Sequence, residues 1–355
     1  METAVERTEL NTLTGSKRIE WVDLCRGLAI LLVMLGHSHE HSIVKDWLYT
    51  FHIPLFFFLS GYVFSVKKYS DYKSFLFNKI RTLLFPMFCF SIINFPISCA
   101  LDGSFSLKDV VHLLGGTFIQ LRGSAWDLGL WFLPCLFVLE NYMWFLLKWS
   151  GARLKRLIPL ILSVFIIGFL YIRLVNKIVP WSFEVACVSL LFFGCGYLAK
   201  LKGKIFDAFS TKVYLIPVFA LASVLSSFGI SRMGTMTDMY ANAIPFLPLY
   251  LTGAFSGILL SVSVFRFLPH KPFKWLMYVG KNTLVFYSLH STFFNLIKEL
   301  IEVVAPSLYS SGSPVDFLVV IISKMVFSTI ILAGISFILN RYCPWMVGKR
   351  RRNGS

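Results

Sequence analysis

An arginine and a histidine, Arg26 and His37, lie eleven residues apart in the first apolar segment of the chain. Eleven steps of 100° return a helix to within about 20° of its starting direction, so both side chains share one face, about 16 Å apart along the axis. Asp23 lies three residues before Arg26, where it can pair with the guanidinium. A histidine can act as a general base near neutral pH and an arginine can bind phosphate, so this face is a candidate site. The alternative is that Arg26 reaches the inner headgroups and His37 only marks the outer end of the helix.

Two further histidines are expected at the depth of His37: His52 near the start of the second apolar segment and His290 in the outer half of the ninth. For any one of them, a hydrogen-bonded structural role is as good an interpretation as a chemical one, but three at one level indicate a site. The run from His37 to His41 offers histidines at i and i+4. The helix is expected to end near residue 38 and no acidic cluster accompanies the run, so no metal site is predicted.

The fourth apolar segment begins near two tryptophans, Trp126 and Trp131. Such residues are typical of the aromatic belt at a membrane interface, or else of a binding surface. The same segment carries Glu140 at depth. Because charges buried in a membrane usually pair, Lys324 in the tenth segment is its expected partner.

The elements that position these residues are predicted to be membrane-spanning helices. The chain has 355 residues, of which 56% are hydrophobic and 15% charged, and its mean hydropathy is +0.70. Soluble domains carry roughly 45–50% apolar and 25% charged residues, so this composition excludes a soluble domain. Apolar stretches of about 20 residues predict an all-α, polytopic bundle of about ten spans. They lie at about 21–38, 47–66, 82–101, 128–147, 157–175, 181–199, 213–230, 241–262, 276–297 and 316–339.

Lysine and arginine are unevenly distributed between the connecting segments. The segments expected inside the cell hold 25 of them, whereas those expected outside hold 7. This bias predicts that both termini are cytoplasmic. Lys79 and Arg81 belong to the inner set and are either ordinary inner-side charges or ligands for an anion. The chain is thus expected to consist of a polar tail 1–20, a single transmembrane domain 21–340 and a basic tail 341–355.

Charge and cysteine content exclude other classes of protein. The net charge of +16 lies in short clusters between apolar runs, so it indicates contact with anionic membrane lipids rather than with nucleic acid. The seven cysteines form no C-x-x-C pair, which argues against a disulfide framework or a zinc site. No A-x-A cleavage pattern follows the first apolar run, so we expect it to be a retained helix and not a signal peptide.

Taken together, the motifs resemble those of the membrane acyltransferase 3 family, especially its branch similar to fucose 4-O-acetylases and other sugar O-acetyltransferases. The resemblance covers about residues 18–340, and the motifs, weak one by one, are specific in this order. They are Asp23-x-x-Arg26-Gly27 with Leu35-Gly36-His37, Phe51-His52-Ile-Pro54 with Ser60-Gly61, Leu130-Trp131-Phe132-Leu133, and Gly280-Lys281-Asn282-Thr283-Leu284 with His290. The R-x-x-R element that is frequent in the family is not complete here, where only Lys79 and Arg81 can supply it.

The resemblance implies transfer of an acetyl group from cytoplasmic acetyl-CoA to a hydroxyl of a cell-surface or lipid-linked saccharide, by a multi-pass protein of the inner membrane. It marks Arg26 and His37 as essential. We expect His37 to be the general base on the acceptor hydroxyl, Asp23 to orient Arg26, and the CoA phosphates to meet Arg26, Lys79 and Arg81. The remaining residues assigned to the site are His52 and His290 for catalysis, and Trp126, Trp131 and Glu140 for binding the acceptor.

A transporter or flippase for a lipid-linked saccharide, without chemistry, is the competing interpretation. Ten spans, charges that line a cavity and basic inner loops suit it too. The inverted repeats and paired broken helices that transporters often show are not found in the sequence. Among enzymes, a succinyl or longer acyl donor is an alternative to acetyl, and a covalent step on Ser60 is an alternative to direct transfer.

Overall fold

The computed structural model describes residues 18–38, 43–101, 103, 106–124, 127–310 and 313–349. Within these ranges the chain is helical, with a single isolated β-bridge between Asp238 and Ala243, which confirms the all-α prediction. The α-helices are α2 (Glu20–Ser38), α3 (Ile43–Val63), α4 (Tyr72–Lys79), α5 (Phe85–Leu101), α6 (Leu107–Ile119), α7 (Phe132–Ser150), α8 (Leu154–Leu174), α9 (Phe183–Leu201), α10 (Gly203–Ser210), α11 (Ile216–Arg232), α12 (Leu247–Phe267), α13 (Lys274–Lys281), α14 (Thr283–Val304), α15 (Ser307–Ser310) and α16 (Pro314–Tyr342). A π-helix, η1 (Ile80–Leu84), precedes α5, and short 3-10 helices are η2 (Pro180–Ser182), η3 (Val213–Leu215), η4 (Lys271–Phe273) and η5 (Pro344–Val347).

Seven helical stretches in the described part of the chain are long and apolar enough to cross a membrane. They contain α2, α5, α8, α9, α11, α12 and α16. The three other predicted spans also form helices, α3, α7 and α14, which are not among these seven stretches. Each of the three carries a polar candidate residue: His52, Glu140 and His290 respectively. The chain is therefore a multi-pass helical membrane protein, and the count of ten spans stays a prediction.

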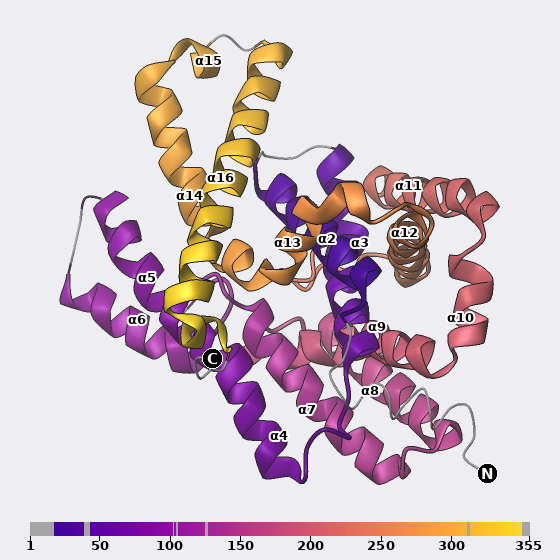
Figure 1. Cartoon of the computed structure of the whole chain (residues 1–355). Coiled ribbons are helices and arrows are strands. Elements are labelled where there is room, and N and C mark those ends of the chain that lie inside the picture. Colours follow the sequence, from indigo (N-terminus) through magenta and orange to yellow (C-terminus); the bar gives the residue numbers. More distant parts are fainter. Residues whose placement is uncertain are drawn as a thin grey trace.

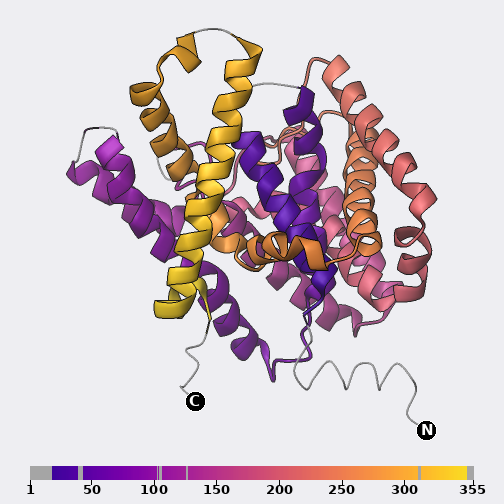
Figure 2. The same cartoon turned by 45° about the horizontal axis from the view of Figure 1, so that its top comes forward.

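The helices form a bundle with α2 at its centre (Figures 1 and 2). In its most apolar window, 67% of α2 is buried within the protein, compared with 22% for α11 and for α16. Apolar side chains on α11 and α16 are thus left for contact with lipid. The two ends of the described chain, Arg18 and Lys349, lie close enough for their charges to interact. Both ends are therefore on one side of the bundle, as an even number of spans requires.

Glycines let the central helices approach each other closely, which is a common device in membranes. A Cβ atom added to Gly61 of α3 would lie 1.9 Å from the carbonyl oxygen of Phe193 in α9. A Cβ atom added to Gly280 of α13 would lie 1.8 Å from the carbonyl oxygen of Asp23 in α2. Replacing either glycine would therefore push two backbones apart, and the second contact lies one turn from Arg26.

Two predicted spans differ from the structure in continuity. The segment 276–297 is not one helix, because it breaks at Asn282 into α13 and α14. The side chain of Asn282 donates to the carbonyl oxygen of Tyr278, and this local bond competes with continuation of the helix. The segment that begins at residue 82 starts within η1, where the hydrogen bonds are those of a π-helix. The hydropathy of the sequence indicates neither the break at Asn282 nor the π-helix η1.

Candidate functional site

The three predicted histidines come together from three helices. The ring of His37, from α2, lies 5.2 Å from that of His290, from α14. The ring of Tyr49 lies 6.4 Å from His37 and 5.0 Å from His52, both distances between centroids, so this tyrosine joins the imidazole of α3 to the other two. We call His37, His52 and His290 the histidine cluster. Tyr49 was missed in the sequence, although its i, i+3 spacing to His52 is a usable signal.

Hydrogen bonds fix the tautomers of two cluster members. His52 Nδ1 lies 2.5 Å from the carbonyl oxygen of Leu48, and His290 Nδ1 lies 2.8 Å from that of Tyr287. A carbonyl oxygen only accepts, so both Nδ1 atoms carry the hydrogen and both Nε2 atoms are acceptors in the neutral rings. Both residues are buried, whereas His37 is exposed and makes no hydrogen bond to any residue that the structure describes. His37 is therefore the imidazole that a substrate can reach.

Lys324 reaches the end of α2 next to His37. Its Nζ donates to the carbonyl oxygen of Ser38 over 3.2 Å, so it satisfies one of the last carbonyls of this helix. The predicted pairing of Lys324 with Glu140 is wrong. Glu140 pairs instead with Lys79, whose Nζ lies 2.7 Å from Oε2. Sequence spacing does not show that Lys324 and Glu140 lie at opposite ends of α2.

The end of α2 that is predicted to face the cytoplasm, called the inner end below, lies among charged groups. Arg26 is half-buried and interacts electrostatically with Asp23 and Glu140, yet it makes no hydrogen bond within the described ranges. Lys79 is held by Glu140 and lies 5.6 Å from the ring centre of Phe75. Glu140 therefore lies with the inner cations and away from the histidine cluster. Among these groups, Arg26 has the donors that are open to a ligand.

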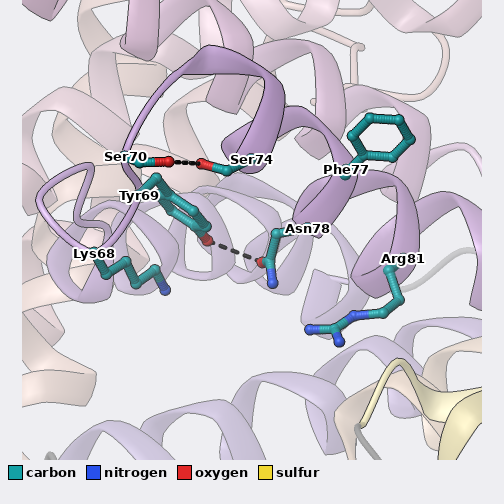
Figure 3. A pocket seen from close by; sticks show the side chains of 7 residues that line it. All are labelled: Lys68, Tyr69, Ser70, Ser74, Phe77, Asn78 and Arg81. Carbon is teal, nitrogen blue, oxygen red and sulfur yellow. Dashed lines mark hydrogen bonds between the residues drawn. The ribbon is translucent and has the colours of Figure 1, made fainter.

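A hollow of about 830 Å³ opens beside this inner group (Figure 3). Tyr69 donates a hydrogen bond to Asn78 over 2.9 Å, and Arg81 extends toward the same space with its Nε buried and unpaired in the part of the chain described. Glu140 interacts electrostatically with Lys68 and Tyr69 of this space, and also with Arg26. We call this space the inner hollow; its lining residues are Lys68, Tyr69, Ser70, Ser74, Phe77, Asn78 and Arg81.

Arg81 lies on the π-helix η1. A π-helix is rare and often marks a functional site, because its wider turn redirects the side chains that follow. The sequence identified Arg81 by charge alone, and nothing in the hydrophobic pattern indicates the altered turn. The sequence does not single out Lys68, in the loop before α4, as a site residue, because its charge is typical of any inner-side segment.

A buried arginine, Arg122, connects the loops near the histidine cluster. Arg122 donates to the carboxylate of Glu184 and to Asn242 Oδ1, the latter over 3.1 Å. Its guanidinium lies 5.7 Å from the ring centre of Trp131 and 5.8 Å from that of Tyr240. We call these five residues, together with Asp127, the outer loop cluster. The sequence identified only Trp131 among them, since Arg122 and Glu184 are distant in the chain.

A tyrosine connects the outer loop cluster to the histidine cluster. The Tyr287 hydroxyl accepts from the backbone N–H of Phe132, which follows Trp131, over 3.0 Å. The Tyr287 ring lies 6.4 Å from that of His290. Tyr240 donates to Asp127, and its ring lies 6.1 Å from Trp131. Trp126, the other tryptophan assigned to the site, lies outside the described residues.

Replacing Arg122 by alanine should destabilise the protein by about 3–5 kcal/mol, because Glu184 would be left as a buried charge without its partner. Thermal unfolding of the detergent-purified protein measures this effect. The matched control is Lys298→Ala, which breaks an exposed pair with Glu302 and should cost about 0–1 kcal/mol. Equal losses for the two variants would contradict the structural role of Arg122.

Comparison with known families identifies the chain. Residues 19–333 match the acyltransferase domain that defines the acyltransferase 3 family. No curated protein and no solved structure matches the chain. The match spans most of the sequence and includes the histidine cluster, Arg26 and the inner hollow. The chain therefore belongs to the acyltransferase 3 family and is a membrane acyltransferase.

Proposed function

We propose that the protein transfers an acetyl group from cytoplasmic acetyl-CoA to a hydroxyl of a saccharide at the outer face of the inner membrane. One arrangement supports the proposal: α2 bears both His37, in the histidine cluster, and Arg26, which interacts electrostatically with Glu140. Glu140 also interacts with Lys68 and Tyr69 of the inner hollow. Arg26 and His37 are eleven residues apart, which is about 16 Å along a helix. An elongated donor with a charged end and a reactive end fits this separation.

The inner hollow suits the nucleotide end of CoA. Arg81 and Lys68 supply positive charge for its phosphates, and an arginine fork binds phosphate oxygens in pairs. Tyr69 and Phe77 offer aromatic faces for an adenine ring. Arg26 then meets the donor where it enters the membrane, and the Asp23 carboxylate interacts with it electrostatically. Glu140 pairs with Lys79 and offsets its charge. Lys79 therefore contributes to the electrostatic potential of the inner hollow more than it binds phosphate directly.

The thioester reacts at the histidine cluster. His37 takes the proton of the acceptor hydroxyl while the hydroxyl oxygen attacks the thioester carbonyl carbon. The ester C–O bond forms, the C–S bond breaks, and the proton on His37 passes to the departing thiolate of CoA. His52 and His290 lie beside this step, and because their Nδ1 atoms donate to backbone, their Nε2 atoms are available as acceptors. Direct transfer of this kind requires no covalent intermediate on Ser60.

The acceptor fits the outer loop cluster. Trp131 and Tyr240 present half-buried aromatic rings, and the Asp127 carboxylate beside Tyr240 can accept bonds from sugar hydroxyls. Tyr287 joins this surface to His290, so a saccharide bound here would have a hydroxyl near His37. A free or lipid-linked glycan can approach from this side.

The test of the proposed function uses inside-out membrane vesicles that carry the protein in their membrane, with acetyl-CoA in the medium and a glycan acceptor enclosed in the lumen. We expect release of free CoA thiol that depends on the acceptor, and a product that is heavier by one acetyl group in mass spectrometry. Vesicles with the His37→Ala variant are the control. Translocation of a lipid-linked saccharide without any thiol release would instead establish a transporter.

The affinity for the donor should depend on pH through Lys68. Burial, followed by the neighbouring Lys79, lowers the pKa of Lys68 below that of a free lysine side chain. Its charge is therefore lost at a lower pH than usual, so CoA binding should weaken as pH rises through this lowered pKa and be constant below it. Equilibrium dialysis of CoA from about pH 7 to about pH 10 measures the decline.

The matched variant for this pH dependence is Lys68→Arg, which stays charged over the same range. We expect its affinity for CoA to be nearly constant where that of the wild type declines. An equal decline in both proteins would mean that another group is titrating and that Lys68 does not bind the donor.

A further inference from the structure

The C-terminal turn packs against the π-helix that carries Arg81. The ring of Trp345, in η5, lies 5.9 Å from that of Phe85, which directly follows η1. A Cβ atom added to Gly348 would lie 2.8 Å from Thr82 Cα and 3.0 Å from the carbonyl oxygen of Arg81. Gly348 also has a φ of +70°, which side chains rarely adopt. A glycine is thus required here both by its conformation and by its contact with the backbone of Arg81.

Lys349, the residue after Gly348, begins a series of hydrogen bonds that leads toward α2. Lys349 donates to the side-chain oxygen of Asn340 in α16, and Asn340 donates to Asn282 Oδ1 over 2.7 Å. Asn282 is the break between α13 and α14, two residues after Gly280. Gly280 is the glycine that fits against the Asp23 carbonyl oxygen, beside Arg26 (Figure 2 shows α13 crossing α2). A continuous set of contacts therefore joins the π-helix to the Arg26 segment.

We propose that Gly348 and the turn η5 are positioning elements of the acyl-donor site. They hold η1 in its π-helical form, so that Arg81 faces the inner hollow, and they fix η1 relative to the segment that carries Arg26. A π-helix has poorer hydrogen-bond geometry than an α-helix, so it persists where surrounding contacts stabilise it. The Gly280-Lys281-Asn282 motif takes part in this arrangement as a structural joint. The inference rests on the proposed function, because it takes Arg81 and Arg26 as ligands of the donor.

The test compares Gly348→Ala with Gly151→Ala. Gly151 also has a positive φ, +60°, but a Cβ there would meet nothing within 4 Å, so it controls for backbone strain alone. We expect Gly348→Ala to raise the KM for acetyl-CoA about tenfold to hundredfold, as when a charge-assisted bond is lost, with kcat unchanged. Gly151→Ala should leave the KM for acetyl-CoA as it is. Equilibrium dialysis of CoA to the purified protein should show the same difference without any acceptor.

Arg81→Ala is measured beside them as the reference. If Arg81→Ala weakens CoA binding and Gly348→Ala does not, the positioning inference is overturned and the proposed function stands. If Arg81→Ala has no effect on CoA binding, the donor site itself is misassigned, and both the positioning inference and the proposed function are overturned. Should Gly348→Ala fail to fold, Asn340→Ala decides instead, because it removes the bonds to Asn282 and Lys349 and leaves the turn itself intact. We expect that variant to raise the KM for acetyl-CoA at least about threefold, and an unchanged KM would overturn the inference.

Discussion

Replacing His37 by alanine is expected to lower acetyl transfer by about 10²- to 10⁴-fold, the usual contribution of a general base. The reason lies in its surroundings: the neighbouring imidazoles of His52 and His290 are buried and bonded to backbone, whereas His37 is exposed and without a hydrogen bond in the described chain. Release of CoA thiol in vesicles, at matched expression, measures the loss.

Two comparisons make the His37 result specific. CoA binding to His37→Ala should equal that of the wild type, since the proposed phosphate ligand Arg26 lies about 16 Å away along the helix. His112→Ala, on α6, removes a histidine outside the cluster and should keep full activity. Wild-type transfer by His37→Ala would mean that the general base is another residue.

Replacing Arg26 by alanine should weaken acetyl-CoA binding about tenfold to hundredfold, because a charge-assisted hydrogen bond to phosphate contributes roughly 1.5–3 kcal/mol. Arg26 is half-buried and has no hydrogen-bond partner in the ranges described, so its donors are available to the ligand. Arg26→Lys should recover only part of the affinity, since an ammonium cannot bind in a bidentate manner. Equilibrium dialysis of CoA separates this effect from catalysis.

The control for Arg26 is Arg266→Ala, another inner arginine on a spanning helix. Arg266 already donates to Asp207 over 2.5 Å and to Ser210, so its loss should not change CoA binding. If Arg26→Ala weakens CoA no more than Arg266→Ala does, the phosphate role is wrong. A loss of CoA binding in both variants would indicate a general effect of inner charge.

Local spacing predicted the parts of the site that lie on one helix. Arg26 and His37 share α2 because the helical period places them there, and α2 runs unbroken from Glu20 to Ser38. The all-α bundle followed from composition. For His37 and His290, the sequence predicts only a similar depth in the membrane. Their contact could not be predicted, because the lateral position of α14 depends on how this helix packs.

The missed features depend on tertiary contacts. The partner of Glu140 was assigned to Lys324 from depth alone, whereas Lys79 reaches it from the end of α4. The π-helical turn at Arg81 depends on backbone hydrogen bonding, which hydropathy does not encode. Arg122 meets Glu184 across a large separation in sequence, and no periodicity connects the two. Each of these requires the fold before it can be recognised.

Three predicted spans, α3, α7 and α14, are not among the seven long apolar stretches, and they carry His52, Glu140 and His290. A helix with such residues passes from the translocon into the bilayer less readily than a fully apolar helix, because each polar side chain disfavours its insertion into lipid. Integration of these helices into the bilayer thus relies on neighbours already in place, such as α2 for α3. Substitutions that make them more apolar would ease insertion and remove the groups assigned to the proposed site. On the proposed function, the polar character of these helices is maintained by activity, at the expense of insertion efficiency.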